Sequence, residues 1–347
     1  MNASDRLVQL MVIRQLLLQR LIAGEERKLN KLFDDIAKEL RRTIQSGSEL
    51  TEYQGRRLDK QISALAQIAN VPVPALGDLP LMEAEYLKAG IEALGLTEVA
   101  LPARSTLAAI ADASLVQGAT IGDWFSRLAS TLRFDIERAV KVGVSLGQTN
   151  KQIADNIIGS GDKGPQPIAK ARRDAMAITR TAVQTVANDA RMSFYGANPD
   201  YIKALQWVST LDSRTSDICI ARSGKTWSFP SMEPIGHSIP WNGGPPAHWA
   251  CRSTVIPVLK TLREMGIDRD NFQQTTRASM DGQVAADLTF DQFLKGKPKE
   301  FADKMLGKGR AELWREGKIT LSELLNQRGQ PLTLTELAAK YGKPELD

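Results

Sequence analysis

Cysteine and histidine are scarce in this chain of 347 residues, which contains two of each. Two cysteines cannot build the disulfide network of a small secreted scaffold, so we expect synthesis in a reducing cytoplasm. Long apolar runs are also missing, because Asp5, Arg6 and Arg14 interrupt the N-terminal segment and no small-residue cleavage site follows it. The sequence therefore predicts a protein without a signal peptide or a membrane span.

Several signatures of catalysis are missing as well. The sequence has no glycine-rich phosphate loop, no nucleophile elbow and no H-E-x-x-H motif, and it lacks the paired C-x-x-C knuckles of zinc fingers. These absences exclude the enzyme classes that the motifs define. The formal net charge of +5 makes the chain mildly basic, which favours contact with nucleic acid or with an acidic protein surface without proving either.

The length and an apolar content of 42% predict two or three packed domains of a predominantly α-helical α+β protein. A helical N-terminal half should precede an α+β domain with a small sheet. We expect a helical arm or hairpin over residues 1–70, a linker and helical connector over 71–119, and the α+β domain over 120–341. Three prolines and a glycine in residues 71–80 cannot continue a helix, which supports the first boundary.

Helical periodicity dominates the sequence up to residue 195. Apolar spacing predicts one long helix, or two helices hinged at Gly24, that end near residues 46–48, and a further helix over 53–70. Residues 81–146 are expected to form helices that are broken around 95–102 and 118–122, followed by a capped short helix within 147–159. Later helices are expected over 168–195 and, after a capping-box pattern at 333–336, over 336–341. The β-branched and aromatic residues of 203–211, 225–229 and 252–259 predict three strands.

The scarcest side chains gather between residues 207 and 257. Cys219, His248 and Cys251 are ligand types that suit zinc, and the H-x-x-C spacing can point two of them at one ion. A fourth ligand would come from Asp212, His237 or water. Four protein ligands would make a structural site and three a catalytic one. A metal-free packed core and a disulfide formed late are the other interpretations.

Four blocks of sequence resemble the phage Mu F-like minor head protein family. They are ITRTAVQTVANDAR at 178–191, WVSTLDSRTSDIC at 207–219, GGPPAHWACRSTVIPV at 243–258 and LGKGRAELWREGKITLSELL at 306–325. The resemblance covers about residues 120–340, in the family's order, so the domain at 120–341 is expected to be a Mu F-like head morphogenesis domain. Residues 1–110 are not covered.

The resemblance implies a minor capsid protein of a tailed bacteriophage, made in the host cytoplasm and located at the portal vertex of the virion head. Its implied partners are the portal protein, the major capsid protein and, as in some members, double-stranded phage DNA. The positions that match the family's motif are Asp212, Cys219, Pro245, Pro246, His248, Cys251 and Arg252. The chain departs from the family at Ala182, where an acid often follows the Arg-Thr pair.

A structural role is the expectation, and a metal-dependent nucleic-acid hydrolase is the alternative. The hydrolase would use Asp212 and His248 as acid and base beside a metal, whereas Asp212 is more simply a turn-forming residue. Basic residues exceed acidic ones between 295 and 318, which is expected of a surface facing packaged DNA or of a solvated surface. The candidate DNA-facing side chains are Lys295, Lys297, Lys299, Lys304, Lys308 and Arg310.

Overall fold

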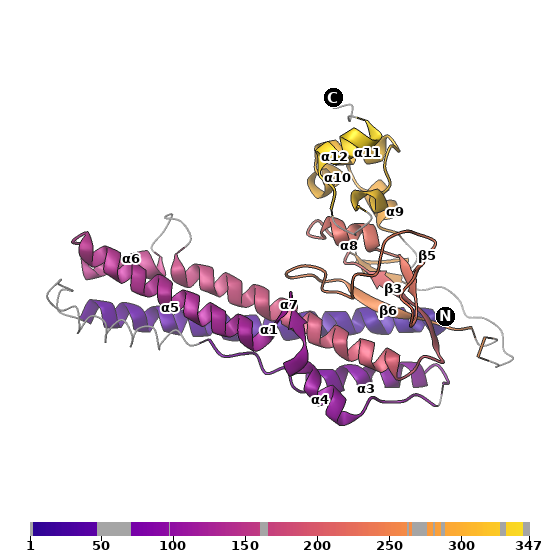
Figure 1. The fold of residues 1–347 in the computed structure, drawn as a ribbon, viewed down its shortest axis with the longest axis horizontal. Coiled ribbons are helices and arrows are strands. Elements are labelled where there is room, and N and C mark those ends of the chain that lie inside the picture. The colour runs from indigo at the N-terminus through magenta and orange to yellow at the C-terminus, as the bar shows by residue number, and fades with distance from the viewer. Residues whose placement is uncertain are drawn as a thin grey trace. The chain divides into compact units, whose positions relative to one another are not determined.

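The computed structural model describes residues 3–46, 71–96, 98–159, 166–261, 264–265, 276–279, 282–285, 289–326 and 331–342. The chain divides into two compact units, each assembled from segments that are distant in the sequence. Unit 1 contains Met1–Leu18, Gly77–Ala111 and Gln184–Asp347, and unit 2 contains Gln19–Leu76 and Asp112–Val183. The long helices α1 (Ala3–Ser46) and α7 (Pro167–Gly196) contribute residues to both units (Figure 1).

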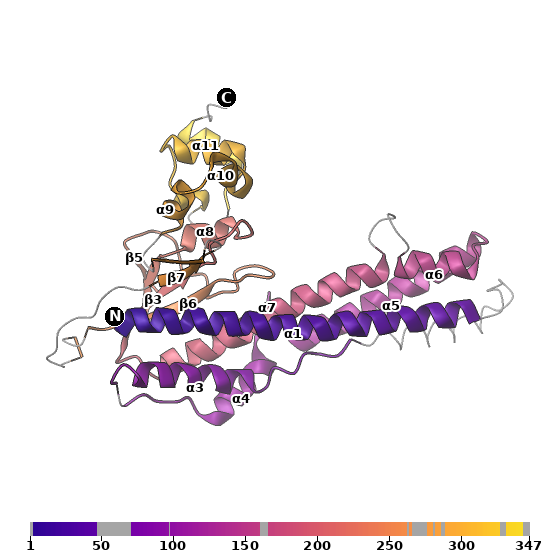
Figure 2. The same cartoon turned by 180° about the vertical axis from the view of Figure 1, so that it is seen from behind.

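Unit 2 consists mainly of helices that pack along their lengths. Besides its parts of α1 and α7, it contains α5 (Ile121–Ser145), α6 (Asn150–Ile158) and the short hairpin of β1 (Leu115–Val116) and β2 (Ala119–Thr120). The helices lie side by side in both views (Figure 1, Figure 2). Their buried apolar side chains recur at helical spacing, as the sequence predicts. The set on α1 and α5 includes Phe33, Ile36, Leu40, Phe125, Leu128, Leu132 and Ile136.

Side-chain caps fix where the helices of unit 2 begin. Thr120 accepts a hydrogen bond from the Asp123 backbone N–H at the start of α5, and the Asp123 carboxylate accepts one from the Thr120 N–H in return. Thr149 and Gln152 form the same reciprocal capping box at the start of α6. Gly159 ends α6 with a φ of 102°, in the left-handed region that glycine adopts without steric cost.

A four-stranded antiparallel sheet in unit 1 has the order β5, β4, β3, β6. The strands are β3 (Ile202–Val208), β4 (Thr226–Ser228), β5 (Pro234–Ile235) and β6 (Thr254–Leu259). The short helix α8 (Asp217–Arg222) lies between β3 and β4 in the sequence. Trp207 and Trp227 are fully buried and pack edge to face, so they anchor the core of the sheet.

Other elements of unit 1 complete two separate hydrophobic cores. Helices α3 (Leu79–Glu92) and α4 (Arg104–Ala113) add side chains to the core around the sheet. The second core holds Phe290, Leu313 and Leu324 and belongs to the C-terminal helices. These are α9 (Phe290–Lys295), α10 (Lys299–Leu306), α11 (Lys308–Arg315), the 3-10 helix η2 (Leu321–Leu324) and α12 (Leu334–Tyr341). A hairpin of β7 (Thr276–Ser279) and β8 (Gly282–Ala285) precedes them.

A buried ionic network connects three distant segments of unit 1. The carboxylate of Glu83, on α3, accepts hydrogen bonds from Arg14 Nε at 2.7 Å and from Arg191 Nε at 3.0 Å. The side chain of Glu83 is 0% exposed, and those of Arg14 and Arg191 are 9% and 1% exposed. Arg191 also donates a hydrogen bond to the Thr254 hydroxyl on β6. The carboxylate therefore pairs with two largely buried guanidinium groups, and its single negative charge balances one of their two positive charges.

The predicted fold class, predominantly helical α+β with a small sheet, is confirmed. Helix α1 is continuous, so Gly24 is not a hinge, and the linker at 71–80 gives way to α3 at Leu79. The predicted helix at 53–70 lies outside the described residues. The domain boundaries at 70 and 119 stay predictions. No helix in the described part of the chain is both long and apolar enough to cross a lipid bilayer.

Candidate functional site

Helix α8 positions Cys219 in the core of unit 1. Ser216 caps the helix, and its hydroxyl accepts a hydrogen bond from the Cys219 backbone N–H at 3.5 Å. The Cys219 carbonyl accepts a hydrogen bond of 2.6 Å from the Ser209 hydroxyl. The residue is 1% exposed. Both backbone polar groups of Cys219 therefore have hydrogen-bond partners, which hold its main chain in place.

His248 and Cys251 come from the loop that precedes β6. The Cys251 N–H donates to the His248 carbonyl at 3.2 Å, which closes a tight turn through Ala250, whose φ is 55°. The turn brings both side chains to one side, as the H-x-x-C spacing predicts. Farther back, the same loop is held by Arg222, which donates to the carbonyls of Pro240 at 2.9 Å and Trp241 at 3.2 Å.

The three predicted ligand side chains meet in space. Cys219 Sγ lies 3.3 Å from His248 Nε2 and 3.5 Å from Cys251 Sγ. All three ligand atoms lie within 4.8 Å of one another, and both cysteines are free thiols. Within the described residues, no other group of histidine, cysteine or carboxylate side chains converges in this way. The structure thus assembles three residues that lie up to 32 positions apart in the sequence.

The pKa values of the two cysteines in the cluster are shifted in opposite directions. A hydrogen bond from Cys219 lowers the pKa of Cys251 to about 4; burial opposes this shift, and the neighbouring His248 supports it. Sharing its proton with Cys251, together with burial, raises the pKa of Cys219. The hydrogen bond with Cys251 also raises the pKa of His248 against the effect of burial. Cys251 is therefore the thiolate of the cluster and Cys219 the thiol that donates to it.

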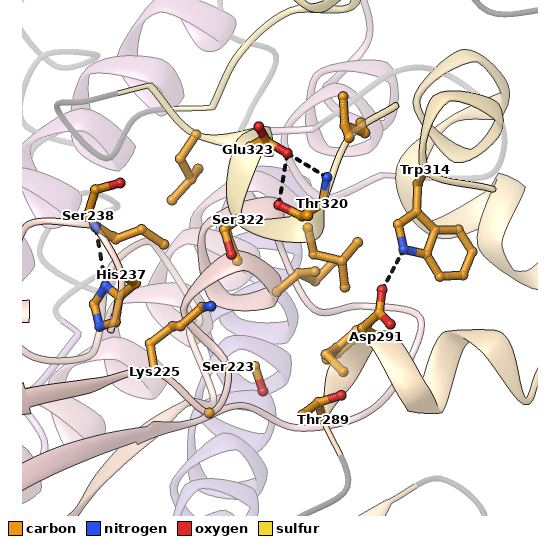
Figure 3. Close-up of a pocket in the computed structure, with 18 of the residues that line it drawn as sticks. Ser223, Lys225, His237, Ser238, Thr289, Asp291, Trp314, Thr320, Ser322 and Glu323 are labelled. Atoms are coloured by element: carbon orange, nitrogen blue, oxygen red, sulfur yellow. Dashed lines mark hydrogen bonds between the residues drawn. The ribbon is translucent and has the colours of Figure 1, made fainter. Parts of the chain in front are cut away.

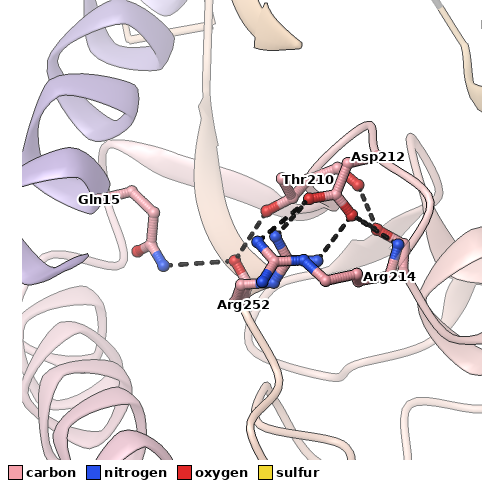
Figure 4. Close-up of polar contacts among 6 residues, drawn as sticks. Gln15, Thr210, Asp212, Arg214 and Arg252 are labelled. Carbon is pink, nitrogen blue, oxygen red and sulfur yellow. Dashed lines mark hydrogen bonds and ion pairs between the residues drawn. The ribbon is translucent and has the colours of Figure 1, made fainter. Parts of the chain in front are cut away.

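Asp212 does not join the cluster; its carboxylate is held by Arg252 (Figure 4). Arg252 Nη2 donates to Asp212 Oδ1 at 2.7 Å, and Nη1 donates to Oδ2. The Arg214 N–H donates to Asp212 Oδ1 at 2.9 Å, as in a turn-forming aspartate. Burial acts to raise the pKa of Asp212, but these hydrogen bonds outweigh it and lower the pKa. The arrangement favours a structural carboxylate over a general base.

His237 also lies apart from the cysteines. Its Nε2 donates to the Thr226 carbonyl at 2.8 Å, and its Nδ1 accepts from the Ile239 N–H at 3.2 Å. The ring packs edge to face on Trp227, with 4.8 Å between the ring centroids. Burial lowers the pKa of His237. Both ring nitrogens of a neutral imidazole are thus occupied, which leaves no lone pair for a metal.

The candidate DNA-facing side chains are mostly engaged within the protein. Lys295 pairs with Asp291 at 2.7 Å, and Arg310 pairs with Asp217. Lys297 lies over the rings of Phe293 and Phe301, and Lys299 lies 3.9 Å from Glu312. Lys304 and Lys308 are exposed, and neither has an ion pair with a described residue. These two lysines are the ones best placed to meet a phosphate backbone.

Sequence reasoning missed a cavity of about 1240 Å³ in unit 1 (Figure 3). Its wall includes Lys225 and His237 on one side and Asp291, Trp314 and Glu323 on the other. Trp314 Nε1 donates to Asp291 Oδ1 at 2.7 Å. Glu323 accepts from the Thr320 N–H at 2.8 Å. Both carboxylates therefore stabilise the wall itself. No local motif could have predicted the cavity, because its wall combines residues about 100 positions apart.

Residues 131–256 match the model of the family described as Phage Mu protein F like protein. The match begins within α5 and ends within β6, so it includes Cys219, His248 and Cys251. The sequence block at 306–325 lies outside it. Comparisons with curated proteins and with solved structures found no match. Residues 131–256 of this chain are therefore similar to the phage Mu protein F-like family, which confirms the resemblance inferred from the sequence.

Proposed function

We propose that this chain is a minor capsid protein for head morphogenesis in a tailed bacteriophage, and that it docks at the portal vertex. The observation that carries the proposal is the family match over residues 131–256. That segment includes β3, α8 and the first half of β6, which contribute to the core of unit 1 together with the Cys/His cluster. The role is assembly, and the expected partners are the portal protein and the major capsid protein.

The N-terminal helix offers a surface for docking. On α1, Ile13, Leu16 and Leu17 are 44%, 54% and 38% exposed, although such side chains are usually buried. They lie within a turn and a half of helix, so they form one apolar patch. An exposed apolar patch on a helix is a common feature of protein interaction sites. We infer that this patch meets a portal or capsid subunit.

A single substitution tests the docking surface. Leu16→Glu should weaken binding to the purified portal protein at least tenfold, because a charge would be buried at the contact. Leu146→Glu is the matched control, because Leu146 is also an exposed leucine, at 68%, but lies at the C-terminal end of α5. Binding would be measured by surface plasmon resonance with circular dichroism as a check of folding. Equal binding by both variants would remove α1 from the interface, and no portal binding by the wild type would refute portal docking.

DNA contact is the second part of the proposal. It is supported by Lys304 and Lys308, which project from the C-terminal helices without an ion pair to a described residue. Unit 2 is a competing surface, because Lys and Arg outnumber Asp and Glu there, whereas the two signs balance in unit 1. Phosphate contacts make binding depend on salt, and each lost contact lowers the slope of log K against log salt by about 1.

The salt dependence of duplex binding separates these surfaces. If Lys304 and Lys308 touch phosphates, replacing both by Gln should lower the slope by about 2 in fluorescence anisotropy titrations. Replacing Lys88, which pairs with Glu92 on α3, is the control for loss of positive charge. An unchanged slope would move the contact to unit 2. No binding at low salt would end the DNA proposal.

We propose a structural protein and not an enzyme. The hydrolase alternative needs Asp212 as a base, but its carboxylate accepts two hydrogen bonds from Arg252 and its pKa is lowered. Incubating the protein with DNA, with and without a chelator, tests this. Cleavage that disappears in both Asp212→Ala and His248→Ala would favour the hydrolase instead.

A further inference from the structure

We propose that Cys219, His248 and Cys251 bind one zinc ion and that the ion ties α8 to the loop before β6. The inference does not depend on the role in the phage head. It rests on three ligand atoms from two distant segments that lie within 4.8 Å of one another. Two of the three side chains are buried and the third is half-buried. The cluster contains both cysteines of the chain.

The donor set selects the class of metal. Two cysteine sulfurs and one imidazole nitrogen are soft and borderline ligands, which zinc accepts. Magnesium and calcium require oxygen ligands, and the nearby carboxylate of Asp212 is committed to Arg252. Among divalent ions of the cytoplasm, zinc therefore fits this set best.

The distances between donor atoms fit tetrahedral coordination. Bonds of about 2.3 Å to sulfur and 2.0 Å to nitrogen place two sulfurs about 3.8 Å apart and a sulfur and a nitrogen about 3.5 Å apart. The corresponding separations here are 3.5 Å and 3.3 Å. An outward movement of a few tenths of an ångström would therefore admit the ion.

Hydrogen bonds outside the cluster orient the ligands. His248 Nδ1 lies 2.9 Å from the Trp249 carbonyl, so Nδ1 carries the proton and donates it. The lone pair of the imidazole is then on Nε2, the atom that faces Cys219. A second partner that fixes the tautomer of a ligating histidine is typical of metal sites. The Ser209 and Ser216 hydroxyls hold the backbone of Cys219, which lies on α8.

Three protein ligands leave one coordination position, which water fills in the isolated chain. The described residues offer no fourth ligand, since Asp212 and His237 are occupied elsewhere. The ion would join positions 219 and 251 and so close the long loop that contains β4 and β5. Long ordered loops need such a constraint, because their backbone is otherwise costly to order. An open fourth position is typical of catalytic zinc, but the nearby Asp212 carboxylate is held by Arg252 and does not face the ion as a base. We therefore assign the ion a structural role on the ground of loop closure.

Cobalt substitution and elemental analysis of the full-length protein test the site. We expect one zinc per purified chain and, after exchange with Co²⁺, the thiolate charge-transfer and tetrahedral d–d absorption bands. Cys251→Ser and His248→Gln should each weaken Co²⁺ binding at least tenfold. His237→Gln is the matched control, because it changes the other histidine and should leave binding unchanged.

Each alternative outcome is decisive. If Cys251→Ser does not fold, His248→Gln still tests the site, because its half-buried side chain is replaced by one of similar size. Metal in the wild type that persists in both variants would overturn the proposal, as would loss of metal from His237→Gln. So would a wild-type chain that binds neither Zn²⁺ nor Co²⁺ under reducing conditions. If Cys219 and Cys251 react with a thiol reagent only after a reductant is added, they form a disulfide instead of binding the ion. This result would also overturn the proposal.

Discussion

Removing the charge of Glu83 should destabilise unit 1 more than any single surface change. Its carboxylate is 0% exposed and forms ion pairs with Arg14 and Arg191, whose side chains are 9% and 1% exposed. Glu83→Gln keeps the shape of the side chain but leaves two guanidinium charges unpaired in the interior. Breaking a buried ion pair from one side costs about 3–5 kcal/mol. Since domains are stable by about 5–15 kcal/mol, a large fraction of the stability would be lost.

Urea denaturation followed by tryptophan fluorescence measures this loss, because five of the six tryptophans, all but Trp124, belong to unit 1. With a slope of 2–3 kcal/mol per molar urea, the midpoint should fall by roughly 1–2 M. Glu85→Gln is the control, since Glu85 is exposed on the same helix two residues away. Equal midpoints for the two variants would refute the reasoning that the charge of Glu83 stabilises the buried arginines.

Two further substitutions probe the site and the helical unit. Asp212→Asn should destabilise the fold by about 1–2 kcal/mol at neutral pH. The lowered pKa of Asp212 means that the folded state binds its proton more weakly than the unfolded state. The difference should therefore begin to shrink below about pH 4 and vanish only as the pH falls through the lowered pKa of the folded state. A pH-independent difference in urea melts would contradict this. Gly143→Ala should cost about 1–3 kcal/mol, because the added Cβ would lie 2.5 Å from Ile153 Cγ1. Gly122→Ala, on the same helix, is the control; its added Cβ would have a nearest contact of 3.8 Å, so the change should be neutral or stabilising. Equal melting temperatures for Gly143→Ala and Gly122→Ala, measured by circular dichroism, would disprove the clash.

Much of the helical architecture could be predicted from local sequence. The spacing of apolar residues on α1 and α5 places them correctly in the cores, and the capping box of Thr149 and Gln152 places the start of α6. The last helix, expected over 336–341, begins two residues earlier at Leu334, where Thr333 caps it. Three of the four strands of the sheet lie within one to three residues of the expected bounds. Such features depend on neighbours within a few residues.

Long-range pairings could not be predicted in the same way. The H-x-x-C spacing brings His248 and Cys251 together locally, but the approach of Cys219 depends on how α8 packs against the β6 loop. The pairing of Asp212 with Arg252 has no local signature, so the sequence leaves Asp212 open as a ligand. The partners of Glu83 lie 69 and 108 positions away. Strand β5 has two residues, which is too short for a period to register.

The placement of the chain in the phage head is the central claim, and the composition of purified heads tests it most directly. Heads of the phage or prophage that encodes the chain would be purified and analysed by quantitative mass spectrometry, with and without the portal protein. We expect the chain to be present in few copies relative to the major capsid protein and to disappear from heads assembled without the portal. Heads that lack the chain although it is expressed, or that retain it without the portal, would contradict the account.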